Sequence, residues 1–158
     1  MAQRKDGRTE EAPVRLVVDS NILITFFWPD SVFRFVAENH IAELVAPSYA
    51  LKEINAHAQE IERRARVQDF EGLLSRLSLF VHFIPESYYL EELRHERWIH
   101  MLTVRTSSAI IEDIDFLALA HKLDCLLWSN DALLKRQDSV RVLNTAEIVE
   151  ILKAFGEM

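Results

Sequence analysis

Short apolar runs alternate along this chain with longer segments whose apolar residues recur every three or four positions. Such runs are typical of strands buried on both faces, and the longer spacing is typical of amphipathic helices. Strands separated by helices predict an α/β fold with three layers, α/β/α, around a mostly parallel sheet of about five strands. The strands are expected near residues 14–19, 44–46, 80–84, 125–129 and 140–143.

The intervening segments predict the helices of the two outer layers. After Pro47 and Ser48, apolar residues spaced three or four apart continue from Leu51 to Ala65, which predicts one long helix there. Thr145 is a suitable N-terminal cap for a last helix through Leu152. The other helices are expected at about 31–39, 70–77, 87–104 and 112–123.

Length and composition predict a single domain. The chain has 158 residues, 49% of them hydrophobic, which is enough for a sizeable core. Residues 1–13 are polar and are expected to form a flexible lead-in, followed by one domain over 14–158. Neither an apolar span of about 20 residues nor a signal peptide is recognisable. A soluble, cytoplasmic protein without a membrane partner is therefore expected.

The net charge of −7 argues against a protein that coats nucleic acid through an excess of Lys and Arg. It does not exclude a nuclease, because carboxylates that hold cations contribute to the negative count. Arginines do gather at 63–66, although nearby glutamates make a solvated helix face the simpler interpretation. The single cysteine, Cys125, excludes an intramolecular disulfide and a thiolate metal cage.

Two carboxylates follow predicted strands, Asp19 after the first and Asp131 after the fourth. In open parallel sheets, ligands bind beyond the carboxyl ends of the strands, so both side chains are expected at such a site. Like charges in one pocket repel each other unless a cation compensates them. Carboxylates without His or Cys partners favour Mg²⁺ or Mn²⁺ over Zn²⁺.

Four segments together resemble the PIN-domain ribonucleases over residues 15–152. The first is Val18-Asp19-Ser20-Asn21-Ile22-Leu23, and the second acidic position corresponds to Glu53 on the helix after Pro47-Ser48. The third is Asp113, which opens the Ala- and Leu-rich stretch that ends at Ala120. The fourth is Trp128-Ser129-Asn130-Asp131. None of these motifs is specific alone, but their order and spacing are.

The resemblance implies an endoribonuclease in which Asp19, Glu53, Asp113 and Asp131 hold one or two Mg²⁺ or Mn²⁺ ions for metal-assisted hydrolysis of RNA. Asp115 is an alternative or helper ligand, or a cap of the helix's first turn. Asn21 and Ser129 are expected either to orient these carboxylates by hydrogen bonds or to satisfy turns. The resemblance also implies a toxin, a small antitoxin partner and a homodimer.

Three alternatives remain open at this point. A phosphatase of the haloacid dehalogenase type requires a second Asp where this chain has Asn21. A non-catalytic member of the PIN-like group would use the same fold to bind RNA or protein. A nuclease of the related flap-endonuclease group normally has more acidic residues and a much longer chain.

Overall fold

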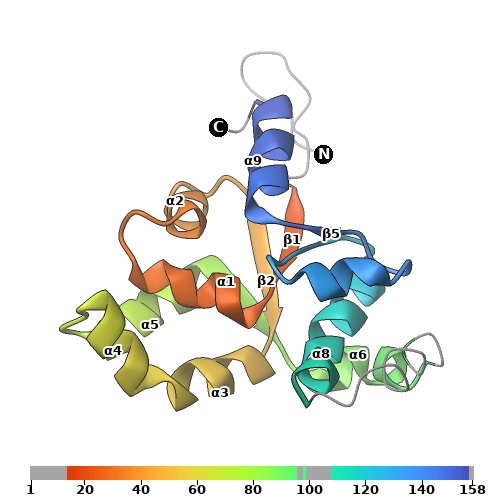
Figure 1. The fold of residues 1–158 in the computed structure, drawn as a ribbon, viewed down its shortest axis with the longest axis horizontal. Helices are drawn as coiled ribbons and strands as arrows, with labels where there is room; N and C mark the ends of the chain where they lie inside the picture. The colour runs from red at the N-terminus through yellow and green to blue at the C-terminus, as the bar shows by residue number, and fades with distance from the viewer. Residues whose placement is uncertain (1–13, 96–97, 99–107, 157–158) are drawn as a thin grey trace.

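Five parallel strands form one sheet in the order β3-β2-β1-β4-β5 (Figure 1), which confirms the predicted α/β fold. The computed structural model describes residues 14–95, 98 and 108–156. The strand order reverses between β1 and β4, and ligands of open α/β sheets bind beyond the carboxyl ends of the strands at such a switch point. The strands are β1 (Arg15–Val18), β2 (Glu43–Pro47), β3 (Val81–Ile84), β4 (Leu126–Trp128) and β5 (Val142–Leu143).

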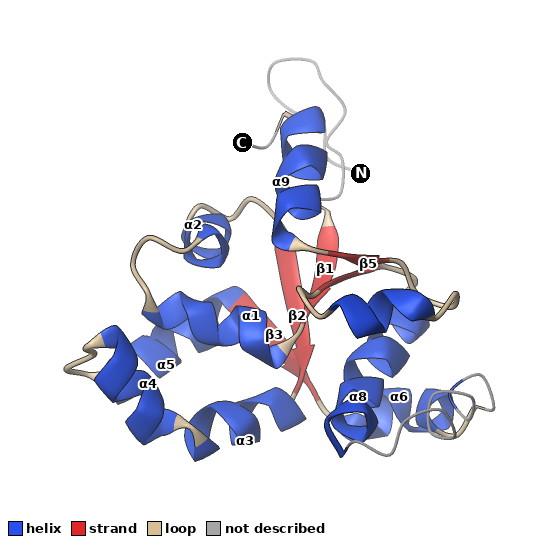
Figure 2. Cartoon of the chain, in the orientation of Figure 1, coloured by secondary structure: helices blue, strands red, loops and turns tan. Residues whose placement is uncertain are grey.

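Helices cover the sheet on both sides, as Figure 2 shows, with α1 to α5 on one side and α6 and α8 on the other. Within the described residues no helix has the length and apolarity needed to cross a membrane. The helices are α1 (Ser20–Ile24), α2 (Val32–Glu38), α3 (Tyr49–Ala56), α4 (Ala58–Ala65), α5 (Phe70–Phe80), α6 (Glu86–Leu93), α8 (Ser108–Leu123) and α9 (Thr145–Ala154), with the 3-10 helices η1 (Thr25–Phe27) and η3 (Ala132–Arg136).

The central strands lie in the middle of the core. The three apolar residues that precede Asp19 in β1 are fully buried, as are Leu127 and Trp128 of β4. Five successive residues of α8, Phe116 to Ala120, are also buried, which confirms that this helix packs in the interior. Because β1, β4 and α8 are closely packed in the hydrophobic core, the polar residues at their ends have defined positions.

The third strand differs from its prediction. Phe80 is the last residue of α5, and only Val81 of β3 is buried. The strand lies at the edge of the sheet, where one side has no neighbouring strand, so its apolar residues are only partly covered. An apolar run alone does not distinguish a central strand from an edge strand.

Three helix boundaries were wrong. The long helix expected through Ala65 is two helices, because His57 adopts a non-helical conformation between α3 and α4. The helix expected over 87–104 ends at Leu93, and much of its remainder lies outside the described residues. The helix expected from 112 begins earlier, at Ser108. Helix ends depend on caps and packing, which apolar spacing does not report.

The C-terminal elements are shorter than predicted or begin differently. β4 begins after Cys125, and β5 contains only Val142 and Leu143. The cap of α9 is Asn144, which forms a reciprocal capping box with Glu147, and not Thr145. Thr145 instead connects α9 to the neighbouring strand, since its hydroxyl accepts a hydrogen bond from the indole of Trp128 at 3.1 Å.

Candidate active site

Asp19 lies at the carboxyl end of β1, where the backbone turns directly into α1. Its amide donates to the carbonyl of Trp128 at 3.1 Å, so the ladder between β1 and β4 continues to this residue. Its side chain caps α1 by accepting from the amide of Ile22 at 2.9 Å. Although it carries a carboxylate, Asp19 is only 5% exposed. The fold therefore fixes both the backbone and the carboxylate of this residue.

Glu53 reaches the same region from α3. The hydroxyl of Ser20, the first residue of α1, donates to Oε1 of Glu53 at 2.6 Å. Ser20 is buried, whereas Glu53 is half-buried. This hydrogen bond joins the helix after β1 to the helix after β2, so it positions the Glu53 carboxylate next to the end of β1.

Asp131 follows β4 by a short loop that is held by hydrogen bonds. The amide of Asp131 donates to the hydroxyl of Ser129 at 3.1 Å. Its carboxylate accepts from the amide of Leu133 at 2.9 Å and so caps η3. Asn130 fixes the other side of the loop, because its side-chain oxygen accepts from the amide of Thr145 at 2.9 Å.

The carboxylates at these three positions influence one another. The pKa of Asp19 is raised to about 6, first because burial disfavours the charged form and also because Asp131 and Glu53 repel a negative charge there. Hydrogen bonds from the side chain of Ser129 and the amide of Ile22 oppose this rise in the pKa. Three of the four predicted acids thus form one electrostatic group with an excess of negative charge.

Asp113 and Asp115 both lie on α8 with half-buried side chains. The hydroxyl of Tyr89 donates to Oδ2 of Asp115 at 2.8 Å. Residues two positions apart on a helix do not face the same side, so Asp113 and Asp115 point in different directions from α8. Asp115 lies well inside α8 and is not a first-turn cap, which corrects that part of the prediction.

The polar residues beside the acids have different roles. Ser129 is 1% exposed and contacts two of them, Asp19 and Asp131, by hydrogen bonds. Asn21 is exposed and lines a pocket beside Glu53, and the hydrogen bond to that glutamate comes from Ser20. Ser20 was not among the predicted site residues, although the sequence places its hydroxyl directly after the strand-end Asp19.

The donor chemistry fits a hard divalent cation. Asp19, Glu53 and Asp131 offer only oxygen atoms, which Mg²⁺ and Mn²⁺ prefer, and a cation would relieve the repulsion that raises the pKa of Asp19. Within residues 14–95, 98 and 108–156, no three His, Cys, Asp or Glu side chains form a ready-made ligand group. The complete four-acid set therefore stays a prediction.

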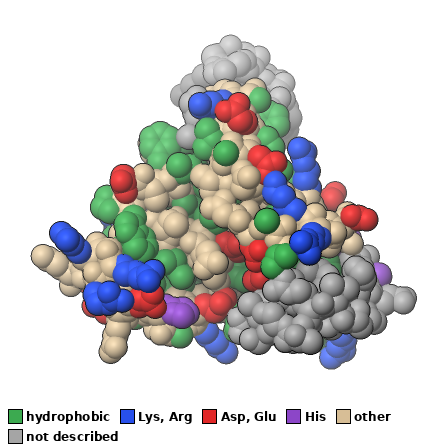
Figure 3. All heavy atoms as spheres, viewed as in Figure 1, with side chains coloured by type: hydrophobic (Ala, Val, Ile, Leu, Met, Phe, Trp, Pro, Cys, Tyr) green, Lys and Arg blue, Asp and Glu red, His purple; other side chains and the backbone are tan. Residues whose placement is uncertain are grey.

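An open pocket lies beside Glu53. Its volume is about 250 Å³, and Ser20 and Glu53 line one end of it. Figure 3 shows acidic side chains near the centre of this face, with a mixed group of basic, acidic and His side chains next to them over α3 and α4. The candidate site thus combines a carboxylate group with an adjoining hollow of mixed charge.

Comparisons with known proteins agree with this arrangement. A family model described as PIN domain matches residues 17–148. No curated protein matches the chain. Among solved structures, the fold is similar to that of a chain in VapBC2 from Rickettsia felis, crystallised bound to a DNA fragment from their promoter. That similarity has a TM-score of 0.56 and 17% sequence identity, and it covers 83% of this chain and 98% of that chain.

At this level of identity, the structural similarity concerns the fold alone. The family model, in contrast, spans most of the chain and includes all four acids that the sequence analysis selected, Asp19, Glu53, Asp113 and Asp131. Members of that family are generally nucleases. The chain therefore belongs to the PIN-domain family.

Proposed function

We propose that this protein is a Mg²⁺- or Mn²⁺-dependent endoribonuclease that hydrolyses phosphodiester bonds in RNA. The observation that carries this proposal is the buried carboxylate of Asp19, whose pKa is raised by burial and by the charges of Asp131 and Glu53. Burying a carboxylate next to other carboxylates disfavours its charged form, and groups with a pKa perturbed in this way are typical of functional sites.

Each residue of the site has a distinct part in the proposed mechanism. Asp19 offers a fixed carboxylate at the switch point of the sheet, because Ile22 and Ser129 hold it by hydrogen bonds. Ser20 directs Glu53 towards the same place. A Mg²⁺ or Mn²⁺ ion bound there would activate water and stabilise charge on the phosphate. The acids thus position the reaction and need no protein nucleophile.

Asp113 is the ligand that we propose from α8. Asp115 already accepts a hydrogen bond from Tyr89, and using it as a ligand would break that contact. Asp113 lies on another side of the helix, and α8 packs against both β1 and β4, whose ends carry the other acids. We therefore assign Asp115 a structural role between α6 and α8.

We further propose that the protein acts in the cytoplasm as the toxin of a toxin–antitoxin pair, as a homodimer held inactive by a small antitoxin. The similarity of the fold to a chain of VapBC2 supports this proposal. Expression of the wild type should arrest growth, and Asp19→Asn should not. Growth arrest by both proteins would contradict a toxin that acts through this site.

The direct test is cleavage of labelled RNA and DNA with Mn²⁺, with Mg²⁺ or with EDTA. The wild type should cut RNA only when a metal is present, and Asp19→Asn and Asp131→Asn should both be inactive. Asp138→Asn is the matched control, since it removes an exposed carboxylate outside the site. RNA cleavage that survives EDTA or either active-site substitution would overturn the metal mechanism.

A non-catalytic module that binds RNA or protein is the second candidate. One observation favours it: within the described part of the chain, no ready-made group of three metal-binding side chains is present. Isothermal titration calorimetry with Mn²⁺ separates the two proposals. Absence of both metal binding and cleavage would favour the binding module.

A further inference from the structure

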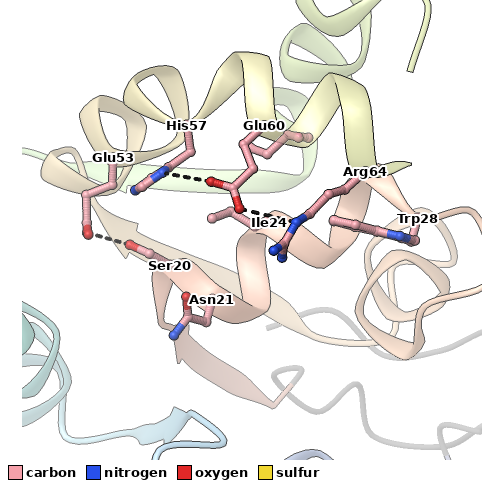
Figure 4. Close-up of a pocket in the computed structure, with 9 residues that line it drawn as sticks. Ser20, Asn21, Ile24, Trp28, Glu53, His57, Glu60 and Arg64 are labelled. Atoms are coloured by element: carbon pink, nitrogen blue, oxygen red, sulfur yellow. Dashed lines mark hydrogen bonds and ion pairs between the residues drawn. The ribbon is translucent and has the colours of Figure 1, made fainter. Parts of the chain in front are cut away.

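The pocket beside the acids has two chemically different ends, which Figure 4 shows. At one end the hydroxyl of Ser20 and the carboxylate of Glu53 form a hydrogen bond of 2.6 Å. At the other end lie the indole of Trp28 and the guanidinium of Arg64. The pocket therefore leads from the carboxylate group of the candidate active site to an aromatic ring and a cation.

The break in the helix at His57 creates this arrangement. Because α4 begins after the break, its residues lie across the pocket from α1 and from Trp28 (Figure 4). His57, Glu60 and Arg64 form the polar wall on the α4 side. In one continuous helix from Ser48 to Ala65, these side chains would extend in a different direction.

Trp28 offers a ring that is partly free. The residue is half-buried and packs against the core with part of its surface, while another part lines the pocket. The other two tryptophans, Trp98 and Trp128, are 1% and 0% exposed. An indole that the fold holds in place and leaves open on one side is suited to stack on a planar base.

Arg64 can be recruited at little cost. Its Nε lies 3.2 Å from Glu60, and both side chains are largely exposed, so this ion pair contributes little stability. His57 also approaches Glu60, at 3.9 Å. Glu60 therefore still has His57 nearby when the Arg64 side chain reorients towards a bound anion. A phosphate is such an anion, and Arg recognises it by two parallel hydrogen bonds.

The size of the pocket limits what it can hold. Pockets for drug-sized ligands have volumes of roughly 300–1,000 Å³, and this one has about 250 Å³. One planar base fits such a volume better than a folded peptide segment does. Because Glu53 lines the same pocket, the rest of a flexible strand bound there would lie next to the candidate active site.

We propose that this pocket binds the nucleotide next to the scissile phosphate of a single-stranded RNA, with its base stacked on Trp28 and a backbone phosphate held by Arg64. This inference rests on the proposed function, which places the scissile phosphate at the carboxylates. It explains how a chain with a net charge of −7 can select RNA. The pocket supplies a local cation and an uncharged stacking surface, so no basic coat is required.

Tryptophan fluorescence tests the stacking directly. The probes are short unstructured oligo-A and oligo-U ribonucleotides, added to the Asp19→Asn protein in Mg²⁺ so that the RNA stays intact. Stacking on Trp28 should quench its emission, and Trp28→Phe should abolish the quench. An abasic oligomer has the same backbone charge and should cause none. A quench that persists in Trp28→Phe, or that the abasic oligomer also causes, would overturn the proposal.

Binding affinities test the two ends of the contact separately. Measured by anisotropy of labelled oligomers, Trp28→Leu should weaken binding about five- to hundredfold. Arg64→Ala should weaken it and lower the slope of log K against log salt by about one. Arg63→Ala is the matched control, because Arg63 is exposed on the same helix and does not line the pocket. Equal losses for both arginine variants would contradict a specific phosphate contact.

The outcomes separate this proposal from the proposed function. RNA cleavage by the wild type without quenching, or with unchanged affinity of the Trp28 variants, overturns the pocket alone. Quenching without cleavage by the wild type would show that the pocket binds a base but would overturn the nuclease, and with it the placement of this base next to a scissile phosphate. Thermal unfolding of each variant, with Trp28→Phe as the conservative one, identifies losses that come from misfolding. A pocket that binds a protein partner and no RNA would overturn the proposal.

Discussion

Two carboxylates of this molecule, Asp19 and Asp115, have raised pKa values for the same first reason, burial, but their neighbours differ. Next to Asp19 lie two further carboxylates, Asp131 and Glu53, which raise its pKa further. Next to Asp115 lies the hydroxyl of Tyr89, which donates a hydrogen bond and lowers the pKa, although Glu86 opposes it. Both carboxylates accept hydrogen bonds that lower the pKa, but Asp19 lies beside two other acids of the candidate site, whereas Asp115 lies beside a tyrosine hydroxyl.

Further polar groups between α6 and α8 also have hydrogen-bond partners, as Asp115 does. Oε2 of Glu92 lies 2.9 Å from Nδ1 of His121. The backbone carbonyl of Glu92 accepts a hydrogen bond from the indole of Trp98 at 2.8 Å. Polar groups in this interface thus have partners within the protein, which is the condition for a stable buried network. The two charged residues that act on the pKa of Asp19, Asp131 and Glu53, are both acidic. Burial is common to both carboxylates, whereas two neighbouring acids, Asp131 and Glu53, repel a charge on Asp19 and Glu86 repels one on Asp115.

The largest effect is expected from the two acids of α8. Asp113→Asn should lower RNA cleavage by about a thousandfold, because it removes a proposed ligand charge. Asp115→Asn should lower it less than about tenfold, because its contact is with Tyr89. Both substitutions keep size and helix position, and single-turnover cleavage measures both. The reverse order would transfer the ligand role to Asp115 and break the comparison.

The second effect is a gain in stability. In EDTA at pH 8, Asp19→Asn should raise the free energy of unfolding by about 2–3 kcal/mol, because the charged carboxylate is disfavoured in the folded state. Its folded pKa of about 6 exceeds the reference value of 3.8, so this cost is complete above pH 6. The gain should therefore shrink as the pH falls below 6 and vanish below about 4.

Urea unfolding of both proteins across this pH range measures the difference. Asn keeps an oxygen that can accept from the amide of Ile22, so the cap of α1 is preserved. Asp138→Asn should show no comparable dependence on pH. Equal stability of Asp19→Asn and the wild type at pH 8 would mean that the carboxylate group is not strained.

The sequence predicted the sheet, and the residues that it selected after two strands lie at the same edge of that sheet. Apolar runs directly before Asp19 and Ser129 marked buried strands, and the side chains after them lie at one crevice because β1 and β4 are adjacent. The partial exposure of β3 could not be predicted, since its edge position depends on the order of all five strands. Local patterns therefore identify strands but not their neighbours.

The break at His57 was missed for a physical reason. Leu51, Ile54 and Ile61 keep the helical spacing on both sides of it, so the pattern continues through one non-helical residue. Neither Gly nor Pro marks the position. The pocket at Trp28 follows from this break, and the sequence analysis therefore did not predict it.

A smaller effect is expected at Asp115, the carboxylate that accepts a hydrogen bond from Tyr89. Tyr89→Phe removes only the hydroxyl that donates to Asp115, and the ring of Tyr89 is 1% exposed. Loss of this donor should lower the free energy of unfolding by about 1–2 kcal/mol at neutral pH. RNA cleavage should not change. The double variant Tyr89→Phe with Asp115→Asn should recover part of the stability, because the buried charge is then absent. A loss of cleavage in Tyr89→Phe would connect the two regions.

The smallest effect separates Ser20 from Asn21, the polar neighbours that follow Asp19. Ser20→Ala should lower RNA cleavage about tenfold, because it removes the hydrogen bond that directs Glu53. Asn21→Ala should change cleavage less than about twofold, since Asn21 is exposed. The apparent affinity for Mn²⁺, measured by titrating the rate, should weaken in the first variant only.

Ser20→Thr provides the matched rescue, because threonine retains the hydroxyl at the start of a short helix. Recovery of cleavage in this variant would show that the donor, and not the size of the side chain, is what Glu53 requires. If Asn21→Ala caused the larger loss, the carboxylate group would be organised from the exposed side of α1. The acids would then depend on contacts that form only when metal or RNA is bound.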